Sequence, residues 1–147
     1  MAFARPPLSL KGRALRLLSQ REHSRAELER KLATHEEAPG TLTQALDELQ
    51  AKGFISEERV VESVIHRRAS KLGTARVQQE LLAKGLSSEA MAETLEQLRS
   101  TELERAREVW SRKFGEPSSD PKERARQMRF LLSRGFASEV VRKVTSP

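Results

Sequence analysis

Apolar residues recur along the chain at intervals of three and four positions, which is the spacing of one face of an α-helix. Leu42, Leu46 and Leu49 form one such stripe, and Met91 and Leu95 begin another. No segment alternates apolar and polar residues with the period of a strand. The pattern therefore predicts an all-α protein of about nine helices, at residues 10–20, 24–34, 41–52, 56–72, 74–84, 88–100, 102–114, 121–134 and 138–144.

A short motif occurs three times between these helices. Each copy reads basic residue, glycine, large apolar residue, any residue, serine, glutamate, with a leucine four positions before the glycine. The copies centre on Gly53, Gly85 and Gly135. A glycine adopts the left-handed conformation that ends a helix, and the apolar residue after it folds back on the last turn. We therefore expect each glycine to stop a helix and a serine three residues later to cap the next one, with either Ser87 or Ser88 in this role at the second corner.

Two further helix starts have signals of their own. Ser24 followed by Glu27 has the spelling of a capping box. Gly73 is expected to stop the helix at 56–72, and Thr74 to cap the helix that follows.

The three glycine motifs recur at unequal intervals, so what repeats is the helix corner and the size of a three-helix group. We predict three tandem three-helix units that form an elongated, curved helical array. Arrays of this kind present an extended surface to a large partner. The predicted parts of the chain are a flexible N-terminal tail at 1–9, a first unit at 10–53, a second at 54–100 and a third at 101–147.

Charged residues make up 33% of the chain, and the formal net charge at pH 7 is +6. This balance favours a polyanionic partner or an acidic protein surface. The sequence has no cysteine, which excludes disulfides, cysteine–zinc sites and thiol catalysis and fits a reducing compartment. No apolar run approaches the roughly 20 residues of a membrane span, and the start of the chain lacks the apolar block of a signal peptide. We expect a cytoplasmic protein that does not bind membranes.

The residues give no indication of an enzyme. The histidines, His23, His35 and His66, do not lie at the spacing of metal ligands. His35 precedes two glutamates, but the segment runs into Pro39-Gly40 and is expected to be a solvated loop. The sequence also lacks a glycine-rich phosphate-binding loop. We therefore expect no catalysis, no cofactor and no metal.

Basic residues gather in three sets, at 11–31, 59–76 and 122–134, whereas glutamates dominate from 89 to 104. Two interpretations stay open for the basic sets. They are either solvated helix faces or a basic stripe along one face of the array, where a polyanionic partner would bind.

Two single residues stand out. Arg68 lies four positions from both Val64 and Leu72, in the middle of an apolar stripe. A charge at that place must reach solvent along its aliphatic stem, pair with a carboxylate of a neighbouring helix, or contact a partner. Trp110, beside Val109, is expected to fill the core of the third unit rather than to anchor a partner.

An ordered series of motifs resembles the bacterial RecX family. The series consists of Gly53-Phe54-Ile55-Ser56-Glu57-Glu58-Arg59, Arg68, Gly73, Arg76-Val77, Glu80-Leu81 and Lys84-Gly85-Leu86. Ser24-Arg25-Ala26-Glu27-Leu28 upstream and Phe130-Leu131-Leu132-Ser133-Arg134-Gly135-Phe136 downstream extend the resemblance to roughly residues 10–145. Ser56 stands where the family usually has an acidic residue, and Val60 and Val64 stand where aromatic residues are common. Looser packing of the second unit is therefore expected.

The resemblance implies a three-unit helical regulator of RecA, the recombinase that coats single-stranded DNA as a helical filament. Family members lie in the filament groove and inhibit the ATPase, strand-exchange and co-protease activities of RecA in recombination and SOS DNA repair. The expected partner is therefore the filament of RecA on single-stranded DNA, bound by a monomer that contacts DNA weakly if at all. We expect the contact residues among basic side chains of the second and third units: Arg67, Arg68, Lys71, Arg76, Arg124, Arg126 and Arg129.

The alternative is a helical module that binds nucleic acid without sequence preference, because three helix–turn–helix corners also suit DNA recognition. A recognition helix needs polar or basic residues at its start. The helices after the corners begin instead with Glu57, Glu89 and Glu139, which a phosphate backbone would repel. This observation favours the regulator of a protein filament.

Overall fold

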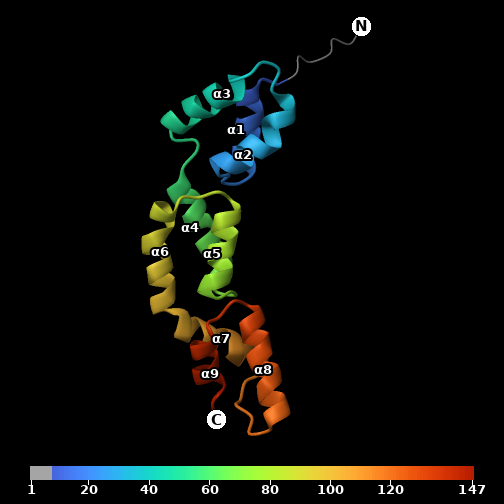
Figure 1. The fold of residues 1–147 in the computed structure, drawn as a ribbon, viewed down its shortest axis with the longest axis vertical. Helices are drawn as coiled ribbons and strands as arrows, with labels where there is room; N and C mark the ends of the chain where they lie inside the picture. The colour runs from blue at the N-terminus through green and yellow to red at the C-terminus, as the bar shows by residue number, and fades with distance from the viewer. Residues whose placement is uncertain (1–7) are drawn as a thin grey trace. The chain divides into compact units, whose positions relative to one another are not determined.

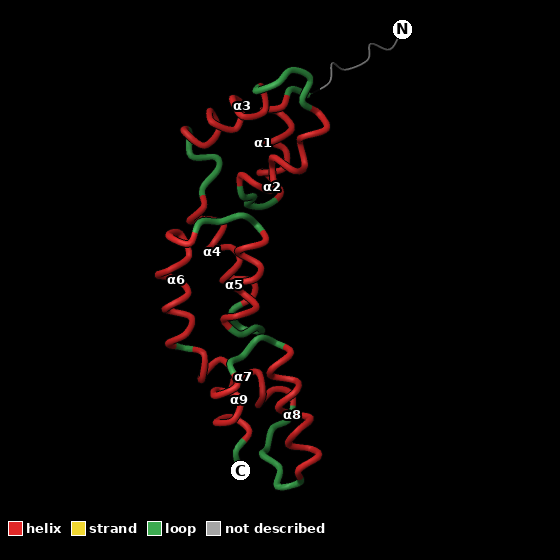
Figure 2. The backbone as a smooth tube through the Cα atoms, viewed as in Figure 1, coloured by secondary structure: helices red, strands yellow, loops and turns green. Residues whose placement is uncertain are grey.

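The computed structural model of the protein describes residues 8–147. Over this range the chain forms nine α-helices and one 3₁₀ helix, and no strand (Figure 2). The all-α expectation is thereby confirmed. The helices are α1 (Leu10–Gln20), α2 (Arg25–Leu32), the 3₁₀ helix η1 (Ala33–His35), α3 (Thr41–Ala51), α4 (Glu57–Arg68), α5 (Thr74–Ala83), α6 (Ser88–Ser100), α7 (Glu102–Lys113), α8 (Pro121–Ser133) and α9 (Ser138–Thr145).

Contacts divide the chain into a compact unit that ends at Val60 and a second one, Val61–Pro147. The first unit holds α1, α2 and α3, which pack on one another (Figure 1). The second unit holds most of α4 and all of α5–α9, and α7, α8 and α9 pack together at its C-terminal end (Figure 1). The finer boundaries expected from the sequence, at 10–53, 54–100 and 101–147, stay a prediction, and the tail predicted at 1–9 lies mostly outside the described residues.

All three glycine corners have the expected conformation. Gly53, Gly85 and Gly135 have φ of 83°, 74° and 88°. At each corner the N–H of the following apolar residue donates to the carbonyl of the leucine before the glycine, as in a Schellman motif. These bonds are Phe54 to Leu49 (2.9 Å), Leu86 to Leu81 (3.4 Å) and Phe136 to Leu131 (3.3 Å). Leu86 and Phe136 are buried, whereas Phe54 is 47% exposed.

The predicted helix caps are only partly confirmed. The capping box of Ser24 and Glu27 is present, and Ser56 Oγ accepts the N–H of Arg59 at 3.3 Å. At the second corner Ser87 is the cap, so Ser88, three residues after the glycine, is already helical. Ser87 was one of the two serines expected there. At the third corner the cap position is Ala137, without a side-chain bond, so the expected cap Ser138 is wrong.

The segment after α4 also departs from the prediction. α4 ends at Arg68 rather than near Leu72. Gly73 has an ordinary φ of −74° and is itself the N-terminal boundary residue of α5. Thr74 is the first helical residue, so its predicted role as cap is wrong. The backbone N–H of Thr74 donates instead to a side chain of α7, which local sequence patterns cannot indicate.

The core of each unit is formed by the apolar faces that the spacing predicted. In the first unit Leu28, Leu32, Leu46, Leu49 and Ile55 are buried together. At the C-terminal end of the second unit, Trp110 packs against a core that includes Leu131 and Phe136, which confirms its expected place. The remaining core of that unit includes Val61, Val64, Val77, Leu81, Leu86, Met91, Leu95 and Leu98.

A buried carboxylate joins α5 and α9 at the start of α7. Glu102 is 5% exposed, and its Oε1 accepts the N–H of Thr74 at 2.7 Å. Its Oε2 accepts the N–H of Ala137 at 3.3 Å. One side chain therefore satisfies the free N–H groups at the beginnings of two helices, where a negative charge is also favoured by the helix dipoles.

Arg105, one turn after Glu102 on the same helix, binds the opposite kind of helix end. Its Nη1 donates to the carbonyls of Ala69 (2.9 Å) and Leu72 (2.7 Å), just after α4. Its Nη2 donates to the carbonyl of Leu98 at 2.8 Å and to Thr74 Oγ1 at 3.1 Å. Burial lowers the pKa of Arg105, and the nearby Glu102 opposes that shift. We call Glu102 and Arg105 the polar joint.

Replacing Glu102 by alanine should lower the free energy of unfolding by about 2–3 kcal/mol, because the Thr74 N–H would be buried without an acceptor. Glu104→Ala, at an exposed position of the same helix, should change it by less than about 0.5 kcal/mol. Urea unfolding followed by circular dichroism measures both. Equal losses for the two variants would contradict the role of the polar joint.

His23 is a buried titratable group of the first unit, at 1% exposure. Its Nδ1 lies 3.0 Å from the carbonyl oxygen of Arg21, and its Nε2 lies 3.1 Å from Lys31 Nζ. Since the lysine ammonium can only donate, Nε2 accepts and Nδ1 carries the proton. The ring is therefore neutral, and burial lowers the pKa of His23.

The free energy of unfolding should decrease as the pH is lowered from about 7 to about 5, because the unfolded chain binds a proton at His23 before the folded chain does. His23→Gln should flatten this part of the profile, whereas His66→Gln, at an exposed position, should leave it unchanged. Urea titrations at a series of pH values measure the effect. A profile that keeps its slope in His23→Gln would rule out this role of the buried ring.

Candidate functional site

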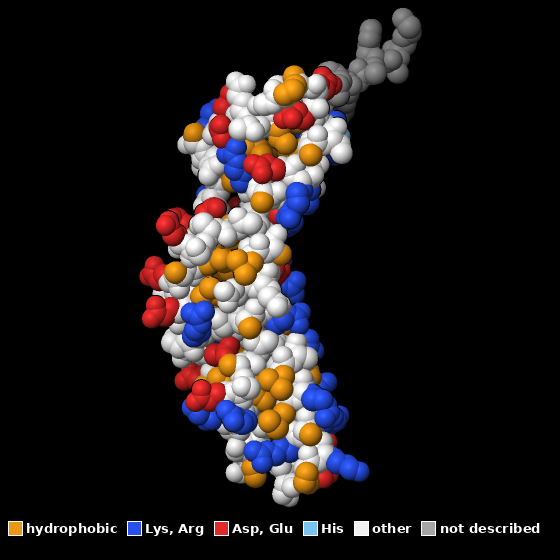
Figure 3. Space-filling view, in the orientation of Figure 1, with side chains coloured by type: hydrophobic (Ala, Val, Ile, Leu, Met, Phe, Trp, Pro, Cys, Tyr) orange, Lys and Arg blue, Asp and Glu red, His pale blue; other side chains and the backbone are white. Residues whose placement is uncertain are grey.

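Basic side chains gather on one side of the second unit. In the space-filling view, lysines and arginines follow the side formed by α5 and α8, whereas acidic side chains gather over α6 (Figure 3). Exposed basic residues at the end of α4, on α5, at the end of α7 and along α8 form what we call the basic strip: Arg68, Lys71, Arg76, Arg112, Lys113, Arg126, Arg129 and Arg134.

A close approach of two glycines brings the basic residues of α5 and α8 together. The N–H of Gly73, just before α5, donates to the carbonyl of Arg134, just after α8, at 2.8 Å. A Cβ atom on Gly73 would lie 2.2 Å from the carbonyl oxygen of Gly135, so the backbones can meet only without a side chain there. Arg76 Nη1 then reaches the carbonyl of Ser133 at 2.8 Å.

Two pockets flank Arg134. One, of about 470 Å³, is lined by Arg134, Arg68 and Arg76 together with Leu72, Gln79 and Glu80. The other, of about 340 Å³, is lined by Arg134, Lys71, Arg112 and Lys113 together with Ser70, Val109 and Phe130. Five helices or their connections therefore contribute cations to one region of the surface.

Most cations of the basic strip have no carboxylate partner within residues 8–147. Arg68 Nε lies 3.4 Å from Glu80 Oε2 on α5, which is the pairing with a neighbouring helix that the sequence left open. Arg126 binds Glu123 at 2.9 Å, and its hydrogen bond lowers the pKa of that carboxyl group. The other six members form no ion pair in the described part of the chain. Unneutralised like charges held side by side favour an anionic partner.

The seven contact residues expected from the sequence lie in different surroundings. Arg68, Lys71 and Arg76 line the two pockets, and Arg126 and Arg129 lie on the exposed face of α8. Arg67 is exposed on α4, with its Nε 3.4 Å from the carbonyl of Ser63.

Arg124 differs from the other six. It lies three positions before Gln127 and seven before Leu131, which are both buried, and is therefore on the inward side of α8. Its Nε is buried and has no hydrogen-bond partner within the described residues.

Four side chains of this region were not among the expected contacts: Arg112, Lys113, Phe130 and Arg134. Arg112 and Lys113 form an adjacent basic pair at the end of a helix, which was the available signal. Phe130 was part of the resemblance, but nothing in the sequence placed it against Lys113, whose Nζ lies 4.8 Å from the ring centre.

The basic residues of the first unit are arranged differently. Lys11 pairs with Glu48, Arg21 pairs with Glu27 at 2.7 Å, and Arg25 pairs with Asp47 at 2.7 Å. These pairs neutralise much of the basic set at 11–31. For the basic set at 11–31, the interpretation as solvated helix faces therefore fits better than the interpretation as a basic stripe.

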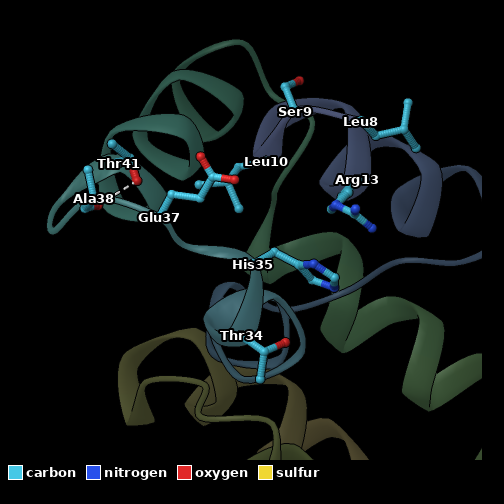
Figure 4. Close-up of a pocket in the computed structure, with 9 residues that line it drawn as sticks. All are labelled: Leu8, Ser9, Leu10, Arg13, Thr34, His35, Glu37, Ala38 and Thr41. Carbon is cyan, nitrogen blue, oxygen red and sulfur yellow. Dashed lines mark hydrogen bonds between the residues drawn. The ribbon is translucent and has the colours of Figure 1, made fainter. Parts of the chain in front are cut away.

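A pocket in the first unit has mixed character (Figure 4). It encloses about 510 Å³. Glu37 and Thr41 lie on one side of it, and Arg13 and His35 lie on the other (Figure 4). Thr41 Oγ1 donates to the carbonyl of Ala38 at 2.7 Å. His35 is exposed, as expected, but it ends the 3₁₀ helix η1 rather than beginning the loop.

Among the described residues, no group of three or more histidine, cysteine, aspartate or glutamate side chains could hold a metal ion. No helix between residues 8 and 147 has both the length and the apolar character needed to cross a bilayer.

Comparison with known families decides what kind of protein carries this surface. Models of the RecX three-helix domains match the chain in order: the first at residues 11–49, the second at 56–95 and the third at 100–145. The chain belongs to the RecX family. The resemblance noted from the motifs is thereby confirmed, and so is the architecture of three three-helix domains.

Curated relatives named "Regulatory protein RecX" match nearly the whole chain. The protein of Leptothrix cholodnii is 60% identical over 144 residues, which is 98% of this chain and 92% of the relative. The protein of Ralstonia nicotianae is 51% identical over the same length, 98% of this chain and 91% of the relative. These names confirm the expectation of a regulator rather than an enzyme.

Solved RecX structures have the same fold. The crystal structure of RecX from Lactobacillus salivarius has a TM-score of 0.76 at 17% identity, and covers 92% of this chain and 91% of that chain. A second crystal structure, of a regulatory protein RecX, has a TM-score of 0.76 at 19% identity and covers 92% of this chain and 70% of that chain.

Alanine at Gly135 should destabilise the protein more than alanine at Gly53. Both glycines have a left-handed φ, of 88° and 83°, so both variants share a strain of about 1 kcal/mol. A methyl group at Gly135 would also lie 2.1 Å from Arg76 Cγ, whereas nothing lies within 4 Å at Gly53. We expect an additional loss of about 2 kcal/mol for Gly135→Ala, measured by urea unfolding. Equal losses would mean that the helix ends do not need this close approach.

Proposed function

We propose that this protein binds the filament that RecA forms on single-stranded DNA and inhibits the ATPase, strand-exchange and co-protease activities of RecA. The observation that carries the proposal is the ordered match of all three RecX domains over most of the chain, together with 60% identity to a protein named as a regulator. RecA regulation is the role that the family resemblance implied.

The basic strip is the part of this chain that suits such a contact best. Lys71, Arg76 and Arg129 are exposed and have no carboxylate partner among the described residues, so an acidic protein surface could pair with them at little cost in broken ion pairs. We place the contact on Arg67, Arg68, Lys71, Arg76, Arg126 and Arg129. Arg124 lies on the inward side of α8. We propose that it contributes to the contact indirectly, by helping to hold α8 in place.

Electrostatic attraction would give this contact a dependence on salt, because exposed charges are screened at physiological ionic strength. Binding to nucleic acid alone is a weaker candidate. α4, α6 and α9 each carry a glutamate in the first turn, and a phosphate backbone would be repelled by these helix starts.

Steady-state ATP hydrolysis by RecA on single-stranded DNA should decrease when the protein is added below the concentration of RecA. Co-sedimentation with the same filaments measures binding directly, with naked single-stranded DNA at the same salt as the comparison. Undiminished hydrolysis together with no co-sedimentation would refute the proposal, whereas equal binding to naked DNA would favour the nucleic-acid module.

The double variant Lys71→Gln/Arg129→Gln should require about three- to tenfold more protein for half-maximal inhibition, since exposed charge pairs contribute up to about 1 kcal/mol each. Arg99→Gln/Arg107→Gln is the matched control, because it removes the same charge from exposed positions of α6 and α7. If the control loses as much inhibition as the test variant, net charge rather than the basic strip determines the contact.

A further inference from the structure

The pocket of about 340 Å³ beside Arg134 combines two kinds of lining that the proposed function does not use together. Its cations are Lys71, Arg112, Lys113 and Arg134, and Phe130 and Val109 form an apolar wall. Both apolar residues are partly buried against the core formed by α7, α8 and α9. The wall is therefore fixed by packing. The volume of the pocket is at the lower end of the range for ligand pockets.

The cations around this wall are held in place without being neutralised. Arg112 Nη2 donates to the carbonyl of Ser70 at 3.2 Å. Lys113 Nζ and Arg134 Cζ lie 4.8 Å and 4.9 Å from the centre of the Phe130 ring, within the range of cation–π attraction. None of the four cations forms an ion pair within the described part of the chain. The charges are thus positioned for an anion that residues 8–147 do not supply.

The apolar wall distinguishes between two anionic partners. A phosphodiester backbone has no side chain to place against Val109 and Phe130, and a base would need an open ring face for stacking. The Phe130 ring is already approached by two cations and by the ring of Phe114, whose centre lies 5.5 Å away at 88°. A peptide offers both required features, carboxylates for the cations and an apolar side chain for the wall.

We propose that this pocket binds an acidic peptide segment that inserts one large apolar side chain between flanking carboxylates. The apolar side chain lies against Val109 and the part of Phe130 that lines the pocket, without needing an open ring face. The carboxylates pair with Arg112, Lys113, Lys71 and Arg134. All four cations belong to the basic strip, but only Lys71 is among the residues on which the contact with RecA is placed above. The pocket therefore adds a recognition element, with an apolar wall, to one part of the strip.

Fluorescence anisotropy tests this with three labelled probes: a short glutamate-rich peptide with a central leucine, the same peptide with serine in place of leucine, and oligothymidylate. The leucine peptide should bind, and the serine peptide should bind at least about tenfold more weakly, because burial of a leucine side chain is lost. Trp110, the single tryptophan of the chain and the neighbour of Val109, should change its fluorescence with the leucine peptide. Equal binding of the two peptides, or tighter binding of oligothymidylate at the same salt, would overturn the proposal.

Two matched double variants test the role of the pocket's cations. Arg112→Gln/Lys113→Gln removes an exposed arginine and lysine at the pocket, and Arg142→Gln/Lys143→Gln removes the same dipeptide from exposed positions of α9. The first should weaken the leucine peptide by about tenfold, and the second by less than about twofold. Equal loss in both would mean diffuse attraction and would end the proposal. No RecA is present, so failure here leaves the proposed function to its own assay.

Discussion

The carboxylate of Glu102 accepts hydrogen bonds from the N–H of Thr74, which begins α5, and from the N–H of Ala137, which immediately precedes α9. The arrangement of the second unit depends on this shared cap. Buried charge is costly unless it is fully paired, and here the partners are backbone N–H groups at two positive helix ends. Arg105 complements it by donating to the carbonyl of Leu72, just after α4, and to that of Leu98 in the last turn of α6. The polar joint therefore fixes four helix ends with two side chains of one helix turn.

The basic strip follows from this arrangement rather than from the composition alone. Glu102 holds the start of α5, and the contact between Gly73 and Gly135 brings the end of α8 beside it. Arg76 and Arg134 then lie at the same place although they are far apart in the sequence. In the first unit, by contrast, Lys11, Arg21 and Arg25 are neutralised by ion pairs with carboxylates of the same unit. Basic side chains therefore form a candidate binding surface only in the second unit, where the backbone brings them together away from carboxylates.

Local features of the fold could be predicted from the sequence because their causes are local. The glycine corners depend on residues within one helix turn, and so does the capping box of Ser24 and Glu27. The C-terminal end of α4 and the start of α5 could not be predicted, because contacts with Glu102 and Arg105 of α7 determine them. For the candidate site, spacing indicated Arg68, Lys71 and Arg76. The contribution of Arg112, Lys113 and Phe130 depends on tertiary contacts that carry no spacing signal.

The shared cap has a consequence for how the second unit opens. If the C-terminal helices separate from the rest, Glu102 cannot keep both of its donors, and the start of α5 loses its acceptor in the same event. Local opening of α9 and fraying of α5 are therefore coupled, although no residue of one lies near the other in sequence. Amide protons at these two places would exchange with solvent as a single cooperative group.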